Sequence, residues 1–275
     1  MEIVIMKRML LTGANRGIGR ALCEALLKRG GFDLTLTTRS DEKGSELKKQ
    51  LEKDGLKRFD LGVVELESDE SIKKFVKSLK KPYDVVYLNA GLNLRKSEAL
   101  KSGMVEKVLR VNFGSHLSLI EGLVNEKLIN KGGKLIQVSS ELGSFRNLRN
   151  EPLRKQLLEA KTLGDLKNAE KEYLQRVTKG EAIFSPREIL PHYAFSKLLI
   201  NLSADIIAKD PRIVALGVES QTCDPGWVQT DMGGAEATLT TAQALPNIIQ
   251  QITLPQDKAN QGKMFSNGKF VEVKG

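Results

Sequence analysis

Short apolar runs alternate with amphipathic stretches along the first half of the chain. Runs rich in leucine and β-branched residues predict strands, whereas apolar residues three and four positions apart predict helices. The repeated order of strand, helix and strand is typical of a parallel sheet covered by helices on both faces. The predicted strands span 8–12, 34–38, 62–66, 85–88 and 134–139, and the predicted helices span 17–29, a Lys/Glu-rich stretch up to about 54, 71–79 and 99–125.

A polar, charge-rich segment interrupts this alternation after the fifth predicted strand. Residues 144–192 contain no predicted strand, and one or two helices are expected within 151–179. Because no internal repeat, linker or low-complexity tract divides the chain, we expect one domain over 1–275 with a helical insertion at about 144–192. After the insertion the pattern predicts helices at 193–209 and 240–251, a strand at 214–221, and a final strand at 264–265 or 270–273.

The composition is that of a globular protein. The chain has 275 residues, 40% of them hydrophobic, which is enough for a substantial core. Its net charge is +9, but lysines recur together with acidic residues through 41–57 and 155–179, as they do on solvated helix faces. Since interleaved aromatic residues and a recognisable module are missing from the sequence, we expect no nucleic-acid partner.

Few residues point to export, membranes or metals. The apolar stretch at 3–6 is interrupted by Lys7 and Arg8, so the sequence predicts neither export nor a membrane partner. Cys23 and Cys223 form no CxxC pair and are interpreted as small buried side chains. The two histidines are not spaced as a metal site. We therefore expect a cytoplasmic protein without a metal.

A glycine-rich turn follows the first predicted strand directly. Glycine permits positive φ and close approach of a ligand, and the start of the following helix offers unpaired N–H groups to a pyrophosphate. The spacing Gly-x-x-x-Gly-x-Gly predicts a dinucleotide site, although a turn without a ligand is the alternative. The residues expected to bind the dinucleotide here are Gly13, Asn15, Arg16, Gly17, Ile18 and Gly19.

The residue after the second predicted strand indicates which dinucleotide is bound. An acidic residue at this point would bind the ribose hydroxyls and disfavour a 2′-phosphate. Here the strand ends in Arg39, whose guanidinium matches a phosphate in charge and geometry, and Arg16 is expected to approach the same group. The sequence therefore favours NADP(H) over NAD(H), with a surface arginine as the alternative.

Three polar residues predict an acid–base site. Tyr193 and Lys197 are four residues apart at the start of a predicted helix, so they share one face. A neighbouring positive charge brings the pKa of a phenol toward the working range. Ser140 follows the fifth predicted strand, at the edge where ligands of open α/β sheets lie. It is positioned to hydrogen-bond a substrate carbonyl beside Tyr193, with Ser139 facing the other way.

Together with Asn89-Ala90-Gly91 and Asn112, these motifs resemble those of the short-chain dehydrogenase/reductase family. They occur in the family's order over nearly the whole chain. The resemblance implies a doubly wound Rossmann fold and a catalytic tetrad of Asn112, Ser140, Tyr193 and Lys197. It also implies that Asn89, Ala90 and Gly91 lie beside the adenosine and ribose, and that Tyr193 and Lys197 contact the cofactor.

The same resemblance extends to two further segments. The Pro-Gly loop after the sixth strand implies that Pro225, Gly226, Val228 and Thr230 hold the nicotinamide end. Trp227 in that loop is expected to bind substrate with Ser140 and Tyr193, although simple packing is the alternative. Glu65 stands where the family often has an aspartate near the adenine.

The long insertion before Tyr193 most resembles the monomeric, NADPH-dependent carbonyl reductase branch of the family. That resemblance implies a monomer that reduces a ketone or aldehyde, with Tyr193 as the proton donor and a small carbonyl compound as the partner. Three alternatives stay open: alcohol oxidation in the reverse direction, reduction of a narrow substrate such as a pteridine or steroid, and NADP sensing without turnover.

Overall fold

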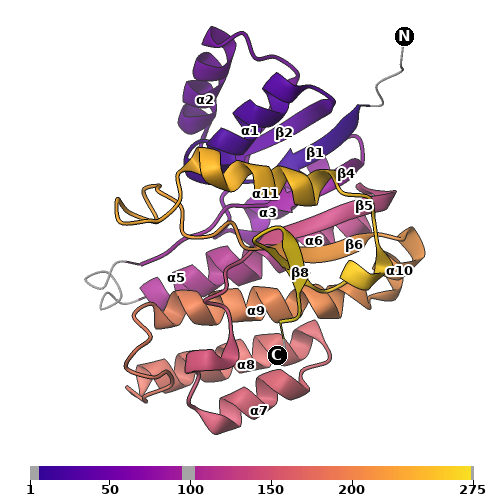
Figure 1. Cartoon of the computed structure of the whole chain (residues 1–275). Coiled ribbons are helices and arrows are strands. Elements are labelled where there is room, and N and C mark those ends of the chain that lie inside the picture. The colour runs from indigo at the N-terminus through magenta and orange to yellow at the C-terminus, as the bar shows by residue number, and fades with distance from the viewer. Residues whose placement is uncertain (1–5, 95–102, 274–275) are drawn as a thin grey trace.

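The computed structural model describes residues 6–94 and 103–273. Its centre is an eight-stranded sheet in the order β3-β2-β1-β4-β5-β6-β7-β8, and every neighbouring pair is parallel except β7 with β8 (Figure 1). The strands are β1 (Lys7–Leu11), β2 (Phe32–Thr38), β3 (Phe59–Val63), β4 (Tyr83–Leu88), β5 (Ile129–Val138), β6 (Glu219–Cys223), β7 (Met264–Ser266) and β8 (Lys269–Val271).

Helices cover both faces of this sheet. The α-helices are α1 (Gly17–Arg29), α2 (Asp41–Lys53), α3 (Asp69–Ser78), α5 (Met104–Leu109), α6 (Ser115–Asn125), α7 (Glu151–Glu159), α8 (Leu163–Thr178), α9 (Pro191–Ala208), α10 (Pro211–Leu216) and α11 (Thr241–Thr253). The short segments are a π-helical turn η1 (Arg110–Gly114) and two 3-10 turns, η2 (Phe145–Asn147) and η3 (Lys258–Asn260).

Each face of the sheet has its own hydrophobic core. Successive strand residues point to opposite faces, so β1 contributes Leu10 to one core and Met9 and Leu11 to the other. The first core includes residues of α3, α5, α6 and α9, and the second includes residues of α1, α2 and α11. The predicted doubly wound Rossmann fold with a parallel central sheet is confirmed.

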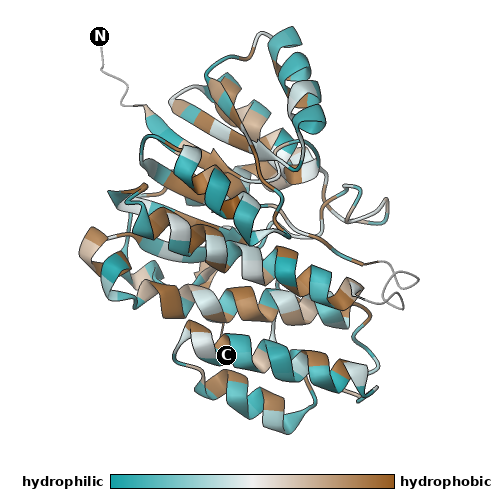
Figure 2. Ribbon diagram, turned by 180° about the vertical axis from the view of Figure 1, so that it is seen from behind, coloured by the Kyte–Doolittle hydropathy of each residue, from teal (hydrophilic) through white to brown (hydrophobic). Residues whose placement is uncertain are grey.

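The predicted insertion is helical and packs on α9. Helix α7 begins after Asn150, whose side chain accepts from Leu153 N, and α8 begins at a capping box formed by Thr162 and Asp165. Figure 1 shows both helices beyond α9 and away from the sheet. Figure 2 shows hydrophilic and hydrophobic residues mixed along them, as expected for helices with one buried and one exposed face.

Several predicted strands have other boundaries in the structure, among them β5, which begins at Ile129 and not at residue 134. The predicted strand at 62–66 is β3 at Phe59–Val63, and its last predicted residues form the turn before α3. The apolar start of the predicted strand at 214–221 is the end of α10, because Asp210 caps a helix there and β6 begins only at Glu219. Both candidate final strands exist and pair antiparallel, so the sheet is not wholly parallel. The predicted start of a helix at Ala99 lies outside the described residues.

Replacing Tyr173 with alanine is expected to lower the free energy of unfolding by about 3–5 kcal/mol, the range for truncating a buried aromatic side chain. Its ring is 1% exposed and stacks on Phe195 of α9 with 3.8 Å between centroids. Urea unfolding followed by circular dichroism measures the change. Lys171→Ala, at an exposed position of the same helix, should stay within about 0.5 kcal/mol of the parent. Equal losses in both variants would contradict the packing described.

Candidate active site

The carboxyl ends of the central strands bring most of the predicted site residues to one edge of the sheet. The glycine turn follows β1, Asn89 follows β4, and Ser140 follows β5. Asp224 and the Pro-Gly loop follow β6, which pairs with β5. Open α/β sheets bind their ligands at this edge. The fold therefore collects segments that are far apart in the sequence.

The glycine turn depends on close backbone approach. Gly13 has φ +69°, and a Cβ there would lie 2.9 Å from the Cα of Ala90. A Cβ on Gly19 would collide with the carbonyl oxygen of Gly13 and lie 2.6 Å from the amide nitrogen of Asn89. The first turn of α1 contains no acidic residue, and its N-cap Arg16 makes no capping bond through its side chain. The N–H groups at the start of α1 remain available to an anion.

Asn89 and Thr12 hold this turn in place. The Asn89 amide donates to Thr12 O at 2.9 Å and to Gly13 O at 3.2 Å. The Thr12 hydroxyl oxygen accepts from Asn89 N and Ala90 N, both at 3.0 Å. The side chain of Asn89 thus bonds to the protein's own turn. Thr12 is not among the predicted site residues, although its position directly before Gly13 indicates a role in holding the turn.

Helix α9 places Tyr193 and Lys197 on one face, as their spacing predicts. The Lys197 ammonium nitrogen lies 5.3 Å from the centroid of the Tyr193 ring and donates to Val138 O, at the end of β5, at 2.8 Å. Lys197 is 3% exposed, whereas Tyr193 is half-buried. The Ser139 hydroxyl donates to Lys197 O at 3.1 Å, so Ser139 is directed at α9.

Ser140 is half-buried, and its hydroxyl oxygen accepts from Leu142 N at 3.2 Å. Its carbonyl oxygen accepts from the Asn201 amide at 3.3 Å, which ties the end of β5 to α9 a second time. Among residues 6–94 and 103–273 the Ser140 hydroxyl donates no hydrogen bond, so its hydrogen can be donated to a ligand.

Asn112 connects the loop after β4 to the start of α9. It lies in η1, where Ser115 N reaches back to Arg110 O in the wider π-helical pattern. Its amide donates to Leu92 O and to the Ser196 hydroxyl oxygen, both at 2.9 Å, and its side-chain oxygen accepts from Leu92 N at 2.7 Å. The Ser196 hydroxyl donates to Tyr193 O at 2.7 Å. Asn112 is fully buried, and it positions the backbone of Tyr193 through Ser196.

Burial dominates the electrostatics of this site. It lowers the pKa of Lys197 to about 8, and Asp224 opposes that shift when it is ionised. Burial raises the pKa of Tyr193, and Asp224 adds to the effect when it is ionised. Burial also lowers the pKa of His116 to about 3, with the positive charge of Lys197 contributing. His116 is therefore neutral near Lys197.

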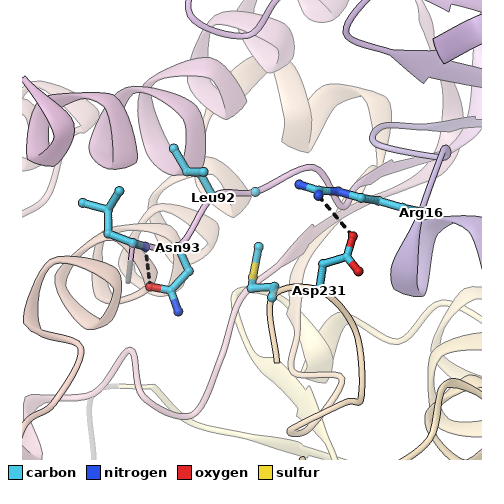
Figure 3. A pocket seen from close by; sticks show the side chains of 7 residues that line it. Arg16, Leu92, Asn93 and Asp231 are labelled. Atoms are coloured by element: carbon cyan, nitrogen blue, oxygen red, sulfur yellow. Dashed lines mark hydrogen bonds and ion pairs between the residues drawn. The ribbon is translucent and has the colours of Figure 1, made fainter. Parts of the chain in front are cut away.

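Two residues predicted to bind the cofactor lie beyond the ends of β2 and β3, the two strands at one side of the sheet. Arg39 follows β2, is exposed, and has no ion pair within 6–94 and 103–273. Glu65 is exposed two residues beyond β3, and its N–H donates to the Ser71 hydroxyl at 2.9 Å. Arg16, which is expected to approach the same phosphate as Arg39, forms an exposed ion pair with Asp231 at 3.2 Å, drawn in Figure 3.

The Pro-Gly loop closes the other side of the site. Gly226 has φ +80°, Val228 is buried, and the Thr230 side chain lies 3.2 Å from a Cβ built on Gly17. Trp227 is 54% exposed and donates through its indole N–H to Gly233 O at 2.9 Å. A small pocket of about 130 Å³ lies where this loop faces the glycine turn (Figure 3). Its lining is Arg16, Gly91, Leu92, Asn93, Leu94, Asp231 and Met232.

Comparison with known proteins identifies the class of enzyme. Residues 7–151 match the family described as short chain dehydrogenase, which is more than half of the chain. The protein belongs to this family of oxidoreductases, as the motifs predict.

Relatives along the whole chain are reductases and dehydrogenases. Carbonyl reductase (NADPH) 3 of Rattus norvegicus is 28% identical, over 96% of this chain and 97% of that protein. (+)-Neomenthol dehydrogenase of Arabidopsis thaliana is 25% identical, over 95% and 96%. Among solved structures, salutaridine reductase from Papaver somniferum superposes with a TM-score of 0.81 at 19% identity, over 94% and 99%. NADPH-bound carbonyl reductase from chicken fatty liver gives 0.68 at 19% identity, over 94% and 95%.

Two absences hold for the described part of the chain. No group of three or more His, Cys, Asp or Glu side chains there is arranged to hold a metal ion. Nor does that part contain a helix long and apolar enough to cross a bilayer. Cys23 and Cys223 are free and buried, as predicted, and burial raises the pKa of each thiol to about 12.

The Lys197 ammonium is expected to lose its proton with a midpoint near pH 8, because burial removes it from water. NMR of protein labelled with ¹³C at the lysine Cε atoms follows this titration. Lys197→Arg assigns the signal by its disappearance. A Lys197 signal that titrates at the ordinary lysine value of about 10.4 would show that the ammonium is solvated.

Proposed function

We propose that this protein reduces a ketone or aldehyde with NADPH, using Tyr193 as the proton donor. The observation that carries the proposal is the buried Lys197 ammonium held by Val138 O, 5.3 Å from the centroid of the Tyr193 ring. A positive charge there stabilises the phenolate that forms when Tyr193 gives up its proton. Relatives named as NADPH carbonyl reductases support the same reaction.

The residues present fit a dinucleotide. The glycine turn leaves space that Cβ atoms at Gly13 and Gly19 would fill, and the start of α1 is open to a pyrophosphate. Arg39 is an exposed cation at the point where a 2′-phosphate is expected. The remaining residues proposed to hold the cofactor are Asn15, Arg16, Gly17, Ile18, Glu65, Asn89, Ala90, Gly91, Tyr193, Lys197, Pro225, Gly226, Val228 and Thr230.

When bound, NADPH supplies the hydride. Ser140 has a free hydroxyl hydrogen and orients the substrate carbonyl oxygen, which then takes the proton of Tyr193 Oη as the C=O bond becomes an alcohol. Lys197 stabilises the resulting phenolate and binds the nicotinamide ribose. Asn112 keeps one lone pair on its side-chain oxygen, which is available to a water that returns a proton to the site.

Trp227 is proposed to contact the substrate, because half of its surface is exposed beside the loop that carries Val228 and Thr230. We also propose that the protein is a monomer, because α7 and α8 cover the outer side of α9, which a second copy would otherwise contact (Figure 1). A cytoplasmic location and a single domain over 1–275 also stay predictions.

Tyr193→Phe is expected to lower kcat for NADPH-dependent reduction by about 10²- to 10⁴-fold, the usual contribution of a positioned acid. NADPH oxidation against a panel of quinones, dicarbonyls, aromatic aldehydes and steroids measures it. Tyr83→Phe is the matched control, because Tyr83 is buried at the start of β4 and its hydroxyl donates to Thr35. Undiminished turnover in Tyr193→Phe would remove the tyrosine from the mechanism.

Arg39→Asp should shift the preference from NADPH toward NADH by about 10- to 100-fold in kcat/KM. A charge-assisted hydrogen bond is worth about 1.5–3 kcal/mol, and each 1.4 kcal/mol is about tenfold. Initial rates with the two cofactors give the ratio. Arg29→Asp, at an exposed position at the end of α1, should leave the ratio unchanged. An unaltered ratio in Arg39→Asp would assign the 2′-phosphate to another cation.

A further inference from the structure

Two acidic residues, exposed Glu141 and buried Asp224, lie next to each other beside the candidate active site. Asp224 follows β6, Glu141 follows Ser140 beyond the end of β5, and Ser266 ends β7. These three strands are neighbours in the sheet. The Ser266 hydroxyl oxygen lies 2.7 Å from Glu141 Oε1 and 3.0 Å from Asp224 Oδ2. It also accepts from the Asn267 amide at 3.3 Å.

Counting hydrogen atoms shows that this group is one proton short when both acids are ionised. The Ser266 hydroxyl has one hydrogen to donate and two lone pairs that accept. With two carboxylates, one of the two close oxygen–oxygen contacts would contain no hydrogen and would be repulsive. With one acid protonated, Ser266 donates to the ionised acid and accepts from the other acid and from Asn267. All three contacts are then satisfied.

The surroundings assign that proton to Asp224. Asp224 is 9% exposed, whereas Glu141 is exposed, and burial disfavours the charged form. The 2.7 Å contact with Glu141 has the length of a hydroxyl donating to a carboxylate. Burial raises the pKa of Asp224, and the negative charge of Glu141 adds to this. Hydrogen bonds that the ionised carboxylate would accept from Gly226 N, the Ser266 hydroxyl and Glu141 N oppose it.

Asp224 is next to the candidate catalytic pair. Val138 pairs with Cys223 in the sheet, and the Lys197 ammonium donates to Val138 O. The ammonium therefore lies beside the strand position that immediately precedes Asp224. The titratable groups that face Asp224 are Glu141 from the loop after β5, Cys223 from β6, and Tyr193 and Lys197 from α9. Strand β7 contributes the uncharged Ser266.

We propose that Asp224 and Glu141 share one proton through Ser266, so that Asp224 is a neutral carboxylic acid beside Tyr193 and Lys197. An ionised Asp224 would oppose formation of the Tyr193 phenolate, and the neutral acid does not. Asp224 is thus a positioning residue that acts through its charge. Its protonation state controls how readily Tyr193 gives up its proton. The catalytic consequence rests on the proposed function, but the shared proton does not.

Infrared difference spectroscopy tests the shared proton without any substrate. A carboxylic acid and a carboxylate absorb at separate frequencies, and ¹³C-aspartate labelling distinguishes Asp224 from Glu141. We expect an acid band that moves with the label, persists at a pH above the ordinary aspartate value of 3.8, and is lost in Asp224→Asn. Asp54→Asn, at an exposed site after α2, should leave it unchanged. A band that is absent, insensitive to the label, or retained in Asp224→Asn overturns the proposal.

The pH profile of turnover tests the consequence. Because Asp224 is neutral below its pKa, reduction of a reactive dicarbonyl by NADPH should slow as the pH rises through that pKa. Asp224→Asn, which is uncharged at every pH, should lose this fall. Glu141→Gln keeps Asp224 in place, removes the neighbouring negative charge, and should move both the fall and the infrared transition to lower pH. A Glu141→Gln variant with an unshifted transition would contradict the coupling.

The two tests separate the two proposals. If the enzyme turns over none of the compounds in the panel, the infrared result still decides whether Asp224 holds a proton. If turnover is normal but the acid band is missing, carbonyl reduction stands and the shared proton is wrong.

Discussion

A buried ammonium group fixes the position of helix α9 relative to the central sheet. Lys197 is almost wholly removed from water, and a cation in that position needs an oxygen partner inside the protein. Val138 O, at the end of β5, supplies it at 2.8 Å. The same helix turn carries Tyr193. The hydrogen bond that stabilises the buried ammonium therefore also determines where the phenol lies.

Several neighbouring contacts depend on this arrangement. Ser139 and Asn201 join the end of β5 to α9, and Asn112 joins α9 to the loop after β4 through Ser196. On the opposite side, Tyr173 of the insertion stacks on Phe195 and bonds with the imidazole of His192 at 2.8 Å. The segment around Tyr193 is thereby held from the sheet side and from the insertion side. The insertion therefore packs against the segment of α9 that carries Tyr193, in addition to enlarging the outer face of the protein.

Local sequence was sufficient for features that depend on local spacing. The glycine turn follows a strand with a helix behind it, and the four-residue interval between Tyr193 and Lys197 sets them on one helix face. The prediction of a strand over 214–221 is wrong at its start, because an apolar run near Val214 fits a short helix equally well and the Asp210 cap favours the helix.

Features that join distant segments were beyond sequence reasoning. The inward direction of Asn89, the ion pair between Arg16 and Asp231, and the acidic pair around Ser266 each need the sheet order before they can be foreseen. Thr12 is an intermediate case, since its hydroxyl contacts a loop that only the pairing of β1 with β4 brings near. The candidate site was therefore predictable as a set of residue types, while their mutual contacts were not.

The short hairpin of β7 and β8 has a consequence for the behaviour of the protein in concentrated solution. A sheet ends in unpaired backbone groups, and a long flat edge strand recruits strands from other molecules. Here one border is β8, with only three residues that turn back antiparallel. The other border is β3, which is five residues long and directly preceded by the charged pair Lys57 and Arg58. The β8 border therefore offers little template for intermolecular pairing, and the positive charges before β3 disfavour pairing at the other border.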